Sequence, residues 1–274
     1  MPAFVRGTDL CAAITEFHEL VLDAVADFVP AVKPQLAFFE QYGVAGMQAF
    51  ENTVLAAKRR GVLVIADGKR NDISSTAEAY ANAYLGDAGF DCDALTVTPY
   101  LGRDSLVPFV EACKKHGKGL FVILKTSNPG SKDFEDQPLE STGRPLYEKI
   151  AGVIRELGDG LVGDAGYSSI GAVVGATFPE EGRRLRALMP KALILVPGYG
   201  AQGGSAQAAA ECFNDDGLGA IVNSSRGITY AFGDPAISRE AFVRSVRENA
   251  QRMIADVNAA VSPATPRTPL QSPA

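Results

Sequence analysis

The amino-acid sequence predicts an α/β protein in which parallel strands and helices alternate to form a barrel. Short runs rich in Val, Ile and Leu alternate with segments in which apolar residues recur every three or four positions. The short runs are apolar on both faces, as in parallel strands that helices cover. Polar and charged residues follow almost every run. This favours a barrel, whose site is built from all its strand ends, over a doubly wound sheet, which gathers such residues near one switch point.

Seven segments have the length and composition of buried strands. A TIM-type (β/α)8 barrel needs eight strands, so we expect the first strand to be missing from this chain. Residues 1–9 show no strand pattern, and Asp9 is expected to cap the first helix. The seven predicted strands are Phe28–Val32, Val62–Ala66, Ala94–Thr98, Gly119–Lys125, Gly171–Gly175, Ala192–Val196 and Gly219–Asn223.

The spacing of apolar residues predicts the helices between these strands. Leu10 to Val25 has apolar residues three or four apart, which places them on one helix face. Met47 to Leu55 repeats the pattern, and Gly61 is expected to end that helix. We expect residues 1–260 to form a single barrel domain. Residues 261–274, with four prolines among small polar residues, are expected to form a disordered tail.

Composition excludes several classes of protein. The net charge of −6 argues against nucleic-acid binding, which needs a basic face. No apolar run reaches the roughly 20 residues that span a bilayer, and the N-terminal residues do not resemble a secretory signal, so we expect a cytoplasmic protein without a membrane partner. The four cysteines form no CxxC pair and only two histidines occur, so we expect no metal site, and the cysteines are expected to be buried apolar residues.

The segment from Val62 to Thr76 carries the most informative cluster of charged residues. A strand period of two places Asp67 and Lys69 on one face, and Lys33 at the end of the preceding strand is expected beside Asp67. Asp72 follows in the loop or first helical turn. An alternating row of four charges at neighbouring strand ends could be an ion-pair network that closes the rim. We favour a ligand site, because such a cluster is costly unless a ligand uses it.

Six blocks of sequence, in order, resemble the orotidine 5′-phosphate decarboxylase family over residues 10–255. They suit its bacterial subgroup with Lys-Pro-Gln and Thr-Ser-Asn-Pro blocks. The most informative block is Asp67-x-Lys69-x-x-Asp72-Ile73-x-x-Thr76. The others are Val32-Lys33-Pro-Gln-x-Ala-Phe-Phe-Glu40, Thr126-Ser-Asn-Pro-Gly130, Val173-Val-Gly-Ala-Thr177, Pro197-Gly-x-Gly-Ala-Gln-Gly203 and Asn223-Ser-Ser-Arg-Gly-Ile228.

The resemblance implies a role for each matching residue in decarboxylation of orotidine 5′-phosphate to uridine 5′-phosphate without a cofactor. Lys69 matches the proton donor and Asp67 the carboxylate beside the departing carboxylate. Lys33 matches a lysine that contacts the ribose and the charge network. The family also implies a homodimer in which Asp72 and Thr76 reach the partner's site. Ser127 matches a residue that contacts the pyrimidine, and Gln202 and Arg226 match residues that bind the phosphate. The other residues expected to bind the substrate are Ile73, Pro197 and Ser225.

A phosphate site is also expected from the residues themselves. Gly198, Gly200 and Gly203 leave backbone amides free to approach an anion, and Arg226 at the next strand end supplies charge. The last two βα loops are the usual phosphate corner of a barrel. The same glycines match a dinucleotide fingerprint, but the following strand does not end in an acidic residue, so we reject that reading.

Two other functions stay open at this point. The first is a related barrel enzyme that acts on a sugar phosphate with a magnesium ion. Such enzymes share Asp-x-Lys-x-x-Asp but lack the Asp72-Ile73-x-x-Thr76 and Thr-Ser-Asn-Pro blocks. The second is a non-catalytic nucleotide-binding remnant, which the missing first strand suggests. The segment Gly130–Glu140 is polar and could be a lid over the substrate or an ordinary surface loop.

Overall fold

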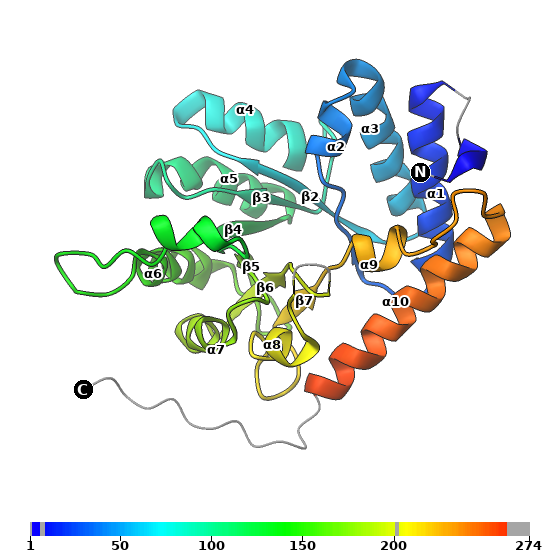
Figure 1. Ribbon diagram of the computed structural model, residues 1–274. Helices are drawn as coiled ribbons and strands as arrows, with labels where there is room; N and C mark the ends of the chain where they lie inside the picture. The colour runs from blue at the N-terminus through cyan, green and yellow to red at the C-terminus, as the bar shows by residue number, and fades with distance from the viewer. Residues whose placement is uncertain (1, 6–8, 201–202, 262–274) are drawn as a thin grey trace. The chain divides into compact units, whose positions relative to one another are not determined.

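The computed structural model describes residues 2–5, 9–200 and 203–261, in which strands and helices alternate (Figure 1). The chain forms two compact units. The first comprises the residues up to Phe121 together with Ser225–Met253, and the second comprises Val122–Ser224 together with the chain from Ile254. All seven predicted strands are present: β1 (Ala31–Val32), β2 (Leu63–Arg70), β3 (Ala94–Val97), β4 (Gly119–Lys125), β5 (Ser168–Val174), β6 (Ala192–Val196) and β7 (Ala220–Val222).

Helices follow the strands along the chain. They are α1 (Leu10–Val25), α2 (Ala37–Glu40), α3 (Gly43–Arg59), α4 (Ser74–Leu85), α5 (Arg103–His116), α6 (Leu146–Gly158), α7 (Pro179–Leu188), α8 (Ala206–Ala210), α9 (Arg226–Thr229) and α10 (Arg239–Val261). Short 3-10 turns are η1 (Ala3–Val5), η2 (Pro129–Asp133) and η3 (Asp159–Leu161). None of the helices described is long and apolar enough to cross a membrane.

In the first unit, β1, β2 and β3 pair in parallel in sequence order. Helices α1 and α3 pack side by side, α3 contacts β2, and α4 packs on α5 (Figure 1). Phe17 and Val25 of α1 pack against Phe242 and Val246 of α10 in a core cluster. This packing is the reason for the apolar face of α1, since burial of each such side chain contributes roughly 1.5–3 kcal/mol. Asp9 caps α1 by accepting bonds from two backbone amides, as predicted.

In the second unit, β5, β6 and β7 also pair in parallel in sequence order. Helix α6 contacts β5 and β6, and α7 packs between α6 and α8. Arg186 of α7 is buried, and its guanidinium donates to the backbone oxygens of Gly219 (3.0 Å) and Ala192 (2.8 Å). These bonds fasten the helix to the starts of β6 and β7, because a buried guanidinium must satisfy its donors.

The strand limits differ from the predicted ones by more than one residue at three places. β1 is shorter, because Phe28 and Val29 form a turn after α1 and pack against the Phe17–Phe242 cluster. β2 is longer and includes Asp67 and Lys69. β5 starts earlier, at Ser168, whose hydroxyl donates to the backbone oxygen of Gly158 at 2.9 Å. The predicted tail begins where α10 ends, at Val261, and residues 262–274 lie outside the described residues.

Candidate active site

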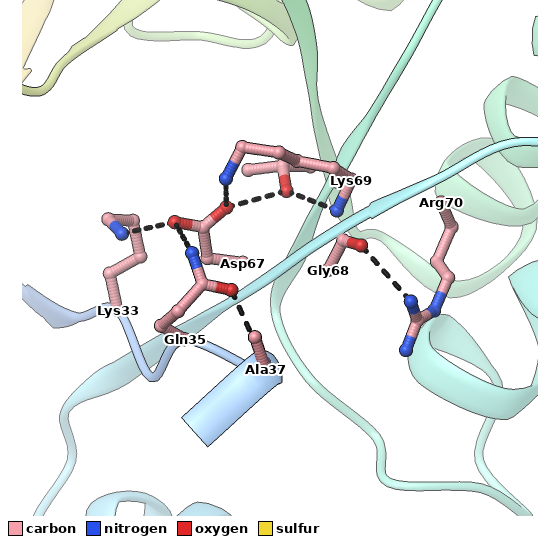
Figure 2. Close-up of polar contacts among 8 residues, drawn as sticks. Lys33, Gln35, Ala37, Asp67, Gly68, Lys69 and Arg70 are labelled. Atoms are coloured by element: carbon pink, nitrogen blue, oxygen red, sulfur yellow. Dashed lines mark hydrogen bonds and ion pairs between the residues drawn. The ribbon is translucent and has the colours of Figure 1, made fainter. Parts of the chain in front are cut away.

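A buried carboxylate with four hydrogen-bond donors forms the centre of the site. Asp67 lies near the carboxyl end of β2 and is 6% exposed. Its Oδ1 accepts from Lys69 Nζ at 2.7 Å and from Thr96 Oγ1 at 3.0 Å. Its Oδ2 accepts from Lys33 Nζ and from Gln35 Nε2, the latter at 3.0 Å. Figure 2 shows Lys33, Gln35 and Lys69 converging on the carboxylate. Both oxygens are thus fully satisfied, as burial of a charge demands.

Backbone pairing beyond β1 explains why Lys33 and Gln35 reach Asp67. The Asp67 amide donates to the Pro34 oxygen at 3.0 Å, and the Leu36 amide donates to the Asp67 oxygen at 3.2 Å. This parallel pairing places the residues on either side of Pro34 beside the carboxylate. Gly68 permits the close approach, since a Cβ there would lie 2.5 Å from Leu36 Cδ1.

Lys33 and Lys69 stabilise the ionised form of Asp67. Burial by itself would raise the pKa of this carboxyl, but the ammonium groups of Lys33 and Lys69 hold its pKa below the usual value. The lysines differ in accessibility: the Lys33 side chain is 12% exposed and that of Lys69 is 47% exposed. Lys69 therefore presents an ammonium group to an incoming ligand while one carboxylate oxygen holds it in place.

The backbone at Lys69 has an unusual conformation. Its φ angle is +47°, and the register between β2 and β3 shifts between Ala66 and Arg70. The Lys69 amide donates to Thr96 Oγ1 of β3 at 2.9 Å. Positive φ is costly for a residue with a Cβ and persists only where the surroundings enforce it. Asp67 and Lys69 thus share one side of β2, as predicted, but through an irregular strand.

Asp72, Ile73 and Thr76 lie at the start of α4, immediately after this strand. The Ile73 amide donates to Asp72 Oδ1 at 2.8 Å. Within the described part of this chain, Asp72 forms no ion pair with Lys33 or Lys69, so three of the four charges in the predicted row form the network. Ile73 is 51% exposed and Thr76 is also exposed. These side chains are available to a partner.

In the second unit, Ser127 follows β4. Hydrogen bonds and ion pairs of Lys125, Glu135 and Asp136 hold the segment around it in place. The Glu135 carboxylate accepts from the Thr126 amide at 3.0 Å and from Thr126 Oγ1 at 2.8 Å. Lys125, fully buried, pairs with Asp136, and its Nζ lies 3.6 Å from Glu135 Oε2. Within Gly130–Glu140, which is expected to be a lid or a surface loop, Glu135 and Asp136 therefore bond to the end of β4 and the residue after it.

The glycines that flank residues 201–202 after β6, here called the glycine turn, lie in the same unit. Gly198, Gly200 and Gly203 all have positive φ angles, which suits glycine because it lacks a Cβ. The Gly200 amide donates to the Gly204 oxygen at 2.8 Å, and Pro197 accepts a bond from the Ala176 amide at 2.9 Å. Gln202 lies outside the described residues, so its predicted phosphate contact stays a prediction.

Ser225 and Arg226 belong to the first unit. Ser225 precedes α9, Arg226 is its first residue, and both are exposed. The glycine turn and Ser127 belong to the second unit, so the meeting of these groups around one phosphate stays a prediction. In the ranges described, no group of three or more His, Cys, Asp or Glu residues could hold a metal ion. Cys92, Cys113 and Cys212 are buried, as expected, whereas Cys11 is partly buried.

Two residues of the network were not predicted from sequence as site residues. Gln35 occurs in the Lys-Pro-Gln block, and its spacing of two from Lys33 was a usable signal. Thr96 is the single hydroxyl in the apolar strand β3. A buried hydroxyl needs a partner, which could have marked Thr96, but its partner depends on the register with β2.

Comparisons with known proteins identify the family of this chain. The sequence profile of the Orotidine 5′-phosphate decarboxylase / HUMPS family matches residues 10–242. The chain belongs to this family of α/β-barrel proteins. Among its relatives, the orotidine 5′-phosphate decarboxylase of Rhodopirellula baltica is 51% identical over 231 residues, covering 82% of this chain and 76% of the relative. The orotidine 5′-phosphate decarboxylase of Caldicellulosiruptor saccharolyticus is 43% identical over 262 residues, covering 93% and 85%.

Solved structures give the same result for the fold. The OMP decarboxylase of Leishmania donovani is 31% identical, with a TM-score of 0.74, over 93% of this chain and 90% of that one. The UMP synthase of the same organism is 33% identical, with a TM-score of 0.76, over 92% of this chain. This chain covers 51% of that longer protein. The predicted barrel class and the predicted family are thus confirmed.

Proposed function

We propose that this protein decarboxylates orotidine 5′-phosphate to uridine 5′-phosphate, the last step of de novo UMP synthesis. Its membership of the family and the names of its relatives support this activity. The observation that carries the proposal is the Asp67 carboxylate held between Lys33 and Lys69, with the Lys69 ammonium accessible. An ammonium fixed beside a carboxylate can stabilise a developing carbanion and then protonate it.

The reaction follows from these groups. Asp67 repels the substrate carboxylate at C6 of the pyrimidine, while Lys69 attracts the charge that develops at C6. The bond from C6 to the carboxylate breaks, its electron pair remains on C6, and carbon dioxide leaves. Lys69 Nζ then transfers a proton to C6, and the resulting amine regains a proton from water. Because the donors are already in place, little reorganisation is needed as the charge forms.

The hydrogen bonding of Asp67 favours this reaction over the magnesium-dependent sugar-phosphate alternative. Each carboxylate oxygen already accepts two bonds, from Lys69 and Thr96 on one side and from Lys33 and Gln35 on the other. A divalent cation would have to displace one of these donors and bind beside the two ammonium groups, which repel it. We propose that the enzyme needs no metal and no organic cofactor.

The substrate is proposed to be a pyrimidine nucleoside monophosphate. Ser127 would contact the pyrimidine, and its backbone oxygen is fixed by a bond from Thr177 Oγ1 at 3.2 Å. The glycine turn after β6, with Pro197 and Gln202, would bind the phosphate together with Ser225 and Arg226. Backbone amides at glycines can approach an anion closely, and an exposed arginine adds charge and a bidentate contact.

We further propose a homodimer with shared active sites. Large apolar side chains are exposed on the segments that follow β1, β2 and β3. Arg70 links two of these segments, because it pairs with Glu40 of α2 and donates to Tyr84 Oη of α4 at 2.9 Å. Exposed apolar patches of this kind typically mark interfaces. The residues are Phe38, Tyr42, Val44, Ile73, Tyr80, Tyr100 and Leu101.

A single assay tests the proposed activity. Purified protein is incubated with orotidine 5′-phosphate in excess chelator, and uridine 5′-phosphate and carbon dioxide are quantified together. We expect equimolar formation of both products. Activity that appears only after magnesium is added would support the sugar-phosphate class instead. Binding of uridine 5′-phosphate without any turnover would support the non-catalytic remnant.

A further inference from the structure

Thr96 of β3 contacts the two central groups of the site although it faces no solvent. It is 1% exposed, and its single hydroxyl group contacts both the Asp67 carboxylate and the Lys69 backbone. We propose that Thr96 is a positioning residue that sets the geometry of the Asp67–Lys69 pair for decarboxylation. This inference rests on the proposed function, and its test below separates the two.

The direction of the two hydrogen bonds follows from chemistry. A backbone amide can only donate, so Thr96 Oγ1 accepts from the Lys69 amide at 2.9 Å. An ionised carboxylate can only accept, so the one hydroxyl proton of Thr96 points to Asp67 Oδ1 at 3.0 Å. The hydroxyl is therefore fixed at both ends and has no alternative orientation. It holds the distance between the carboxylate and the backbone of the lysine.

The Lys69 backbone needs such a support. With φ at +47°, Lys69 lies in the left-handed region, where its Cβ crowds the following carbonyl oxygen. The register shift between Ala66 and Arg70 interrupts the regular ladder with β3 at this point. The Thr96 hydroxyl takes the place of the missing ladder acceptor. The bond from the Lys69 amide to Thr96 thus helps to hold a costly backbone conformation at the residue that carries the ammonium group.

The same hydroxyl also affects the charge of Asp67. The charged and polar groups that face this carboxylate are Lys33 and Gln35 from the end of β1, Lys69 from β2 and Thr96 from β3. Loss of the hydroxyl would leave Asp67 Oδ1 with Lys69 alone and the Lys69 amide without its acceptor. A carboxylate with fewer donors has a higher pKa.

Three variants test the proposal. Thr96→Val keeps the shape of the side chain and removes both bonds, and Thr96→Ser keeps the hydroxyl. Thr53→Val is the control for loss of a buried hydroxyl, because Thr53 is 3% exposed and bonds only the Ala49 oxygen of its own helix, at 2.7 Å. The measurements are kcat and KM with orotidine 5′-phosphate and, separately, the titration of the Asp67 carboxyl followed by carbon-13 NMR.

For Thr96→Val we expect kcat to fall about 10- to 100-fold with KM within about threefold, because misplacement of a fixed charge reduces transition-state stabilisation. Thr96→Ser should restore kcat to within about threefold, and Thr53→Val should leave it unchanged. The Asp67 titration should move to higher pH in Thr96→Val only.

Two results overturn the proposal. If the wild-type protein is active and Thr96→Val retains its kcat, Thr96 has no positioning role, while the proposed function stands. If the wild-type protein does not turn over orotidine 5′-phosphate, the proposed function fails. The NMR titration of the Asp67 carboxyl then still tests whether Thr96 acts on Asp67. If the Asp67 carboxyl titrates at the same pH in the wild type and in Thr96→Val, the Thr96 hydroxyl does not act on Asp67. This result contradicts the proposal whether or not the wild type is active.

Discussion

At the scale of the residue, the charges of the site could be predicted but the neutral groups around them could not. Lys33, Asp67 and Lys69 were placed together from strand ends and a period of two, and the structure confirms this network. Charged residues at the ends of apolar strands are conspicuous in a sequence. Thr96 lies within the predicted strand Ala94–Thr98, and its partners have no sequence signal, because its contacts depend on a register shift that composition does not reveal.

The pH dependence of stability provides a prediction for Asp67. Its pKa in the folded protein lies below the unfolded value of about 3.9, because Lys33 and Lys69 outweigh the effect of burial. The stabilisation is therefore present above that unfolded value and is lost as the pH falls through the folded pKa. We expect Asp67→Asn to be less stable than the wild type by about 2 kcal/mol at pH 7. The difference should shrink at pH values below about 4.

Denaturant unfolding of both proteins between pH 3 and pH 7 measures this difference. Glu140→Gln serves as a control for removal of one exposed carboxylate, and its stability should follow that of the wild type. A gap between wild type and Asp67→Asn that stays constant down to pH 3 would show that the lysines do not depress the pKa of Asp67.

At the scale of the element, apolar patterns predicted where strands and helices occur better than where they end. β2 extends past its apolar run into Asp67 and Lys69, because backbone pairing with the Pro34 segment continues there. The polar segment Gly130–Glu140 could not be assigned from composition. Its attachment depends on Lys125 and Glu135, which the chain brings together only when the segment folds back on the end of β4.

The attachment of this segment can be tested with Glu135→Gln. The variant retains the size of the side chain but removes a buried negative charge that lies beside buried Lys125 and accepts two bonds from Thr126. We expect a loss of about 2 kcal/mol in the free energy of unfolding, because bonds to a charged group contribute about 1.5–3 kcal/mol. Urea unfolding provides the value. The matched control is Glu140→Gln, an exposed position in the same segment, which should stay within about 0.5 kcal/mol of the wild type.

Limited proteolysis of the two variants completes the element-scale test. Glu135→Gln should be cleaved faster than the wild type between Pro129 and Glu140, whereas Glu140→Gln should not. Equal cleavage of all three proteins, together with equal stability, would show that the carboxylate does not hold this segment.

At the scale of the whole molecule, the alternation of strands and helices was sufficient to predict the barrel class, and six ordered blocks predicted the family. Both predictions agree with the comparisons. The phosphate corner stays a proposal. Its residues come from separate loops, Gly198–Gly203 and Ser225–Arg226, and only tertiary structure can bring such loops together.

The shared active site predicts complementation between inactive proteins. Lys69→Ala removes the proton donor, and Asp72→Asn removes the residue proposed to enter the partner's site. A mixed dimer would hold one site with neither substitution. Mixing the two inactive proteins under conditions of subunit exchange should therefore restore some activity, up to about one quarter of the wild-type value for random pairing. If subunit exchange is demonstrated and activity does not return, each site uses residues of its own chain only.

The most direct test of the account is the turnover of Lys69→Ala measured beside its binding of uridine 5′-phosphate. Lys58→Ala is the matched control, because Lys58 also pairs with an aspartate, Asp91, but lies outside the proposed site. We expect Lys69→Ala to lose at least about three orders of magnitude in kcat, since it removes both the electrostatic stabilisation and the proton. Calorimetric binding of uridine 5′-phosphate should stay within about tenfold of the wild type, and Lys58→Ala should behave as the wild type. Retention of more than a few per cent of the wild-type kcat by a folded Lys69→Ala would contradict the account.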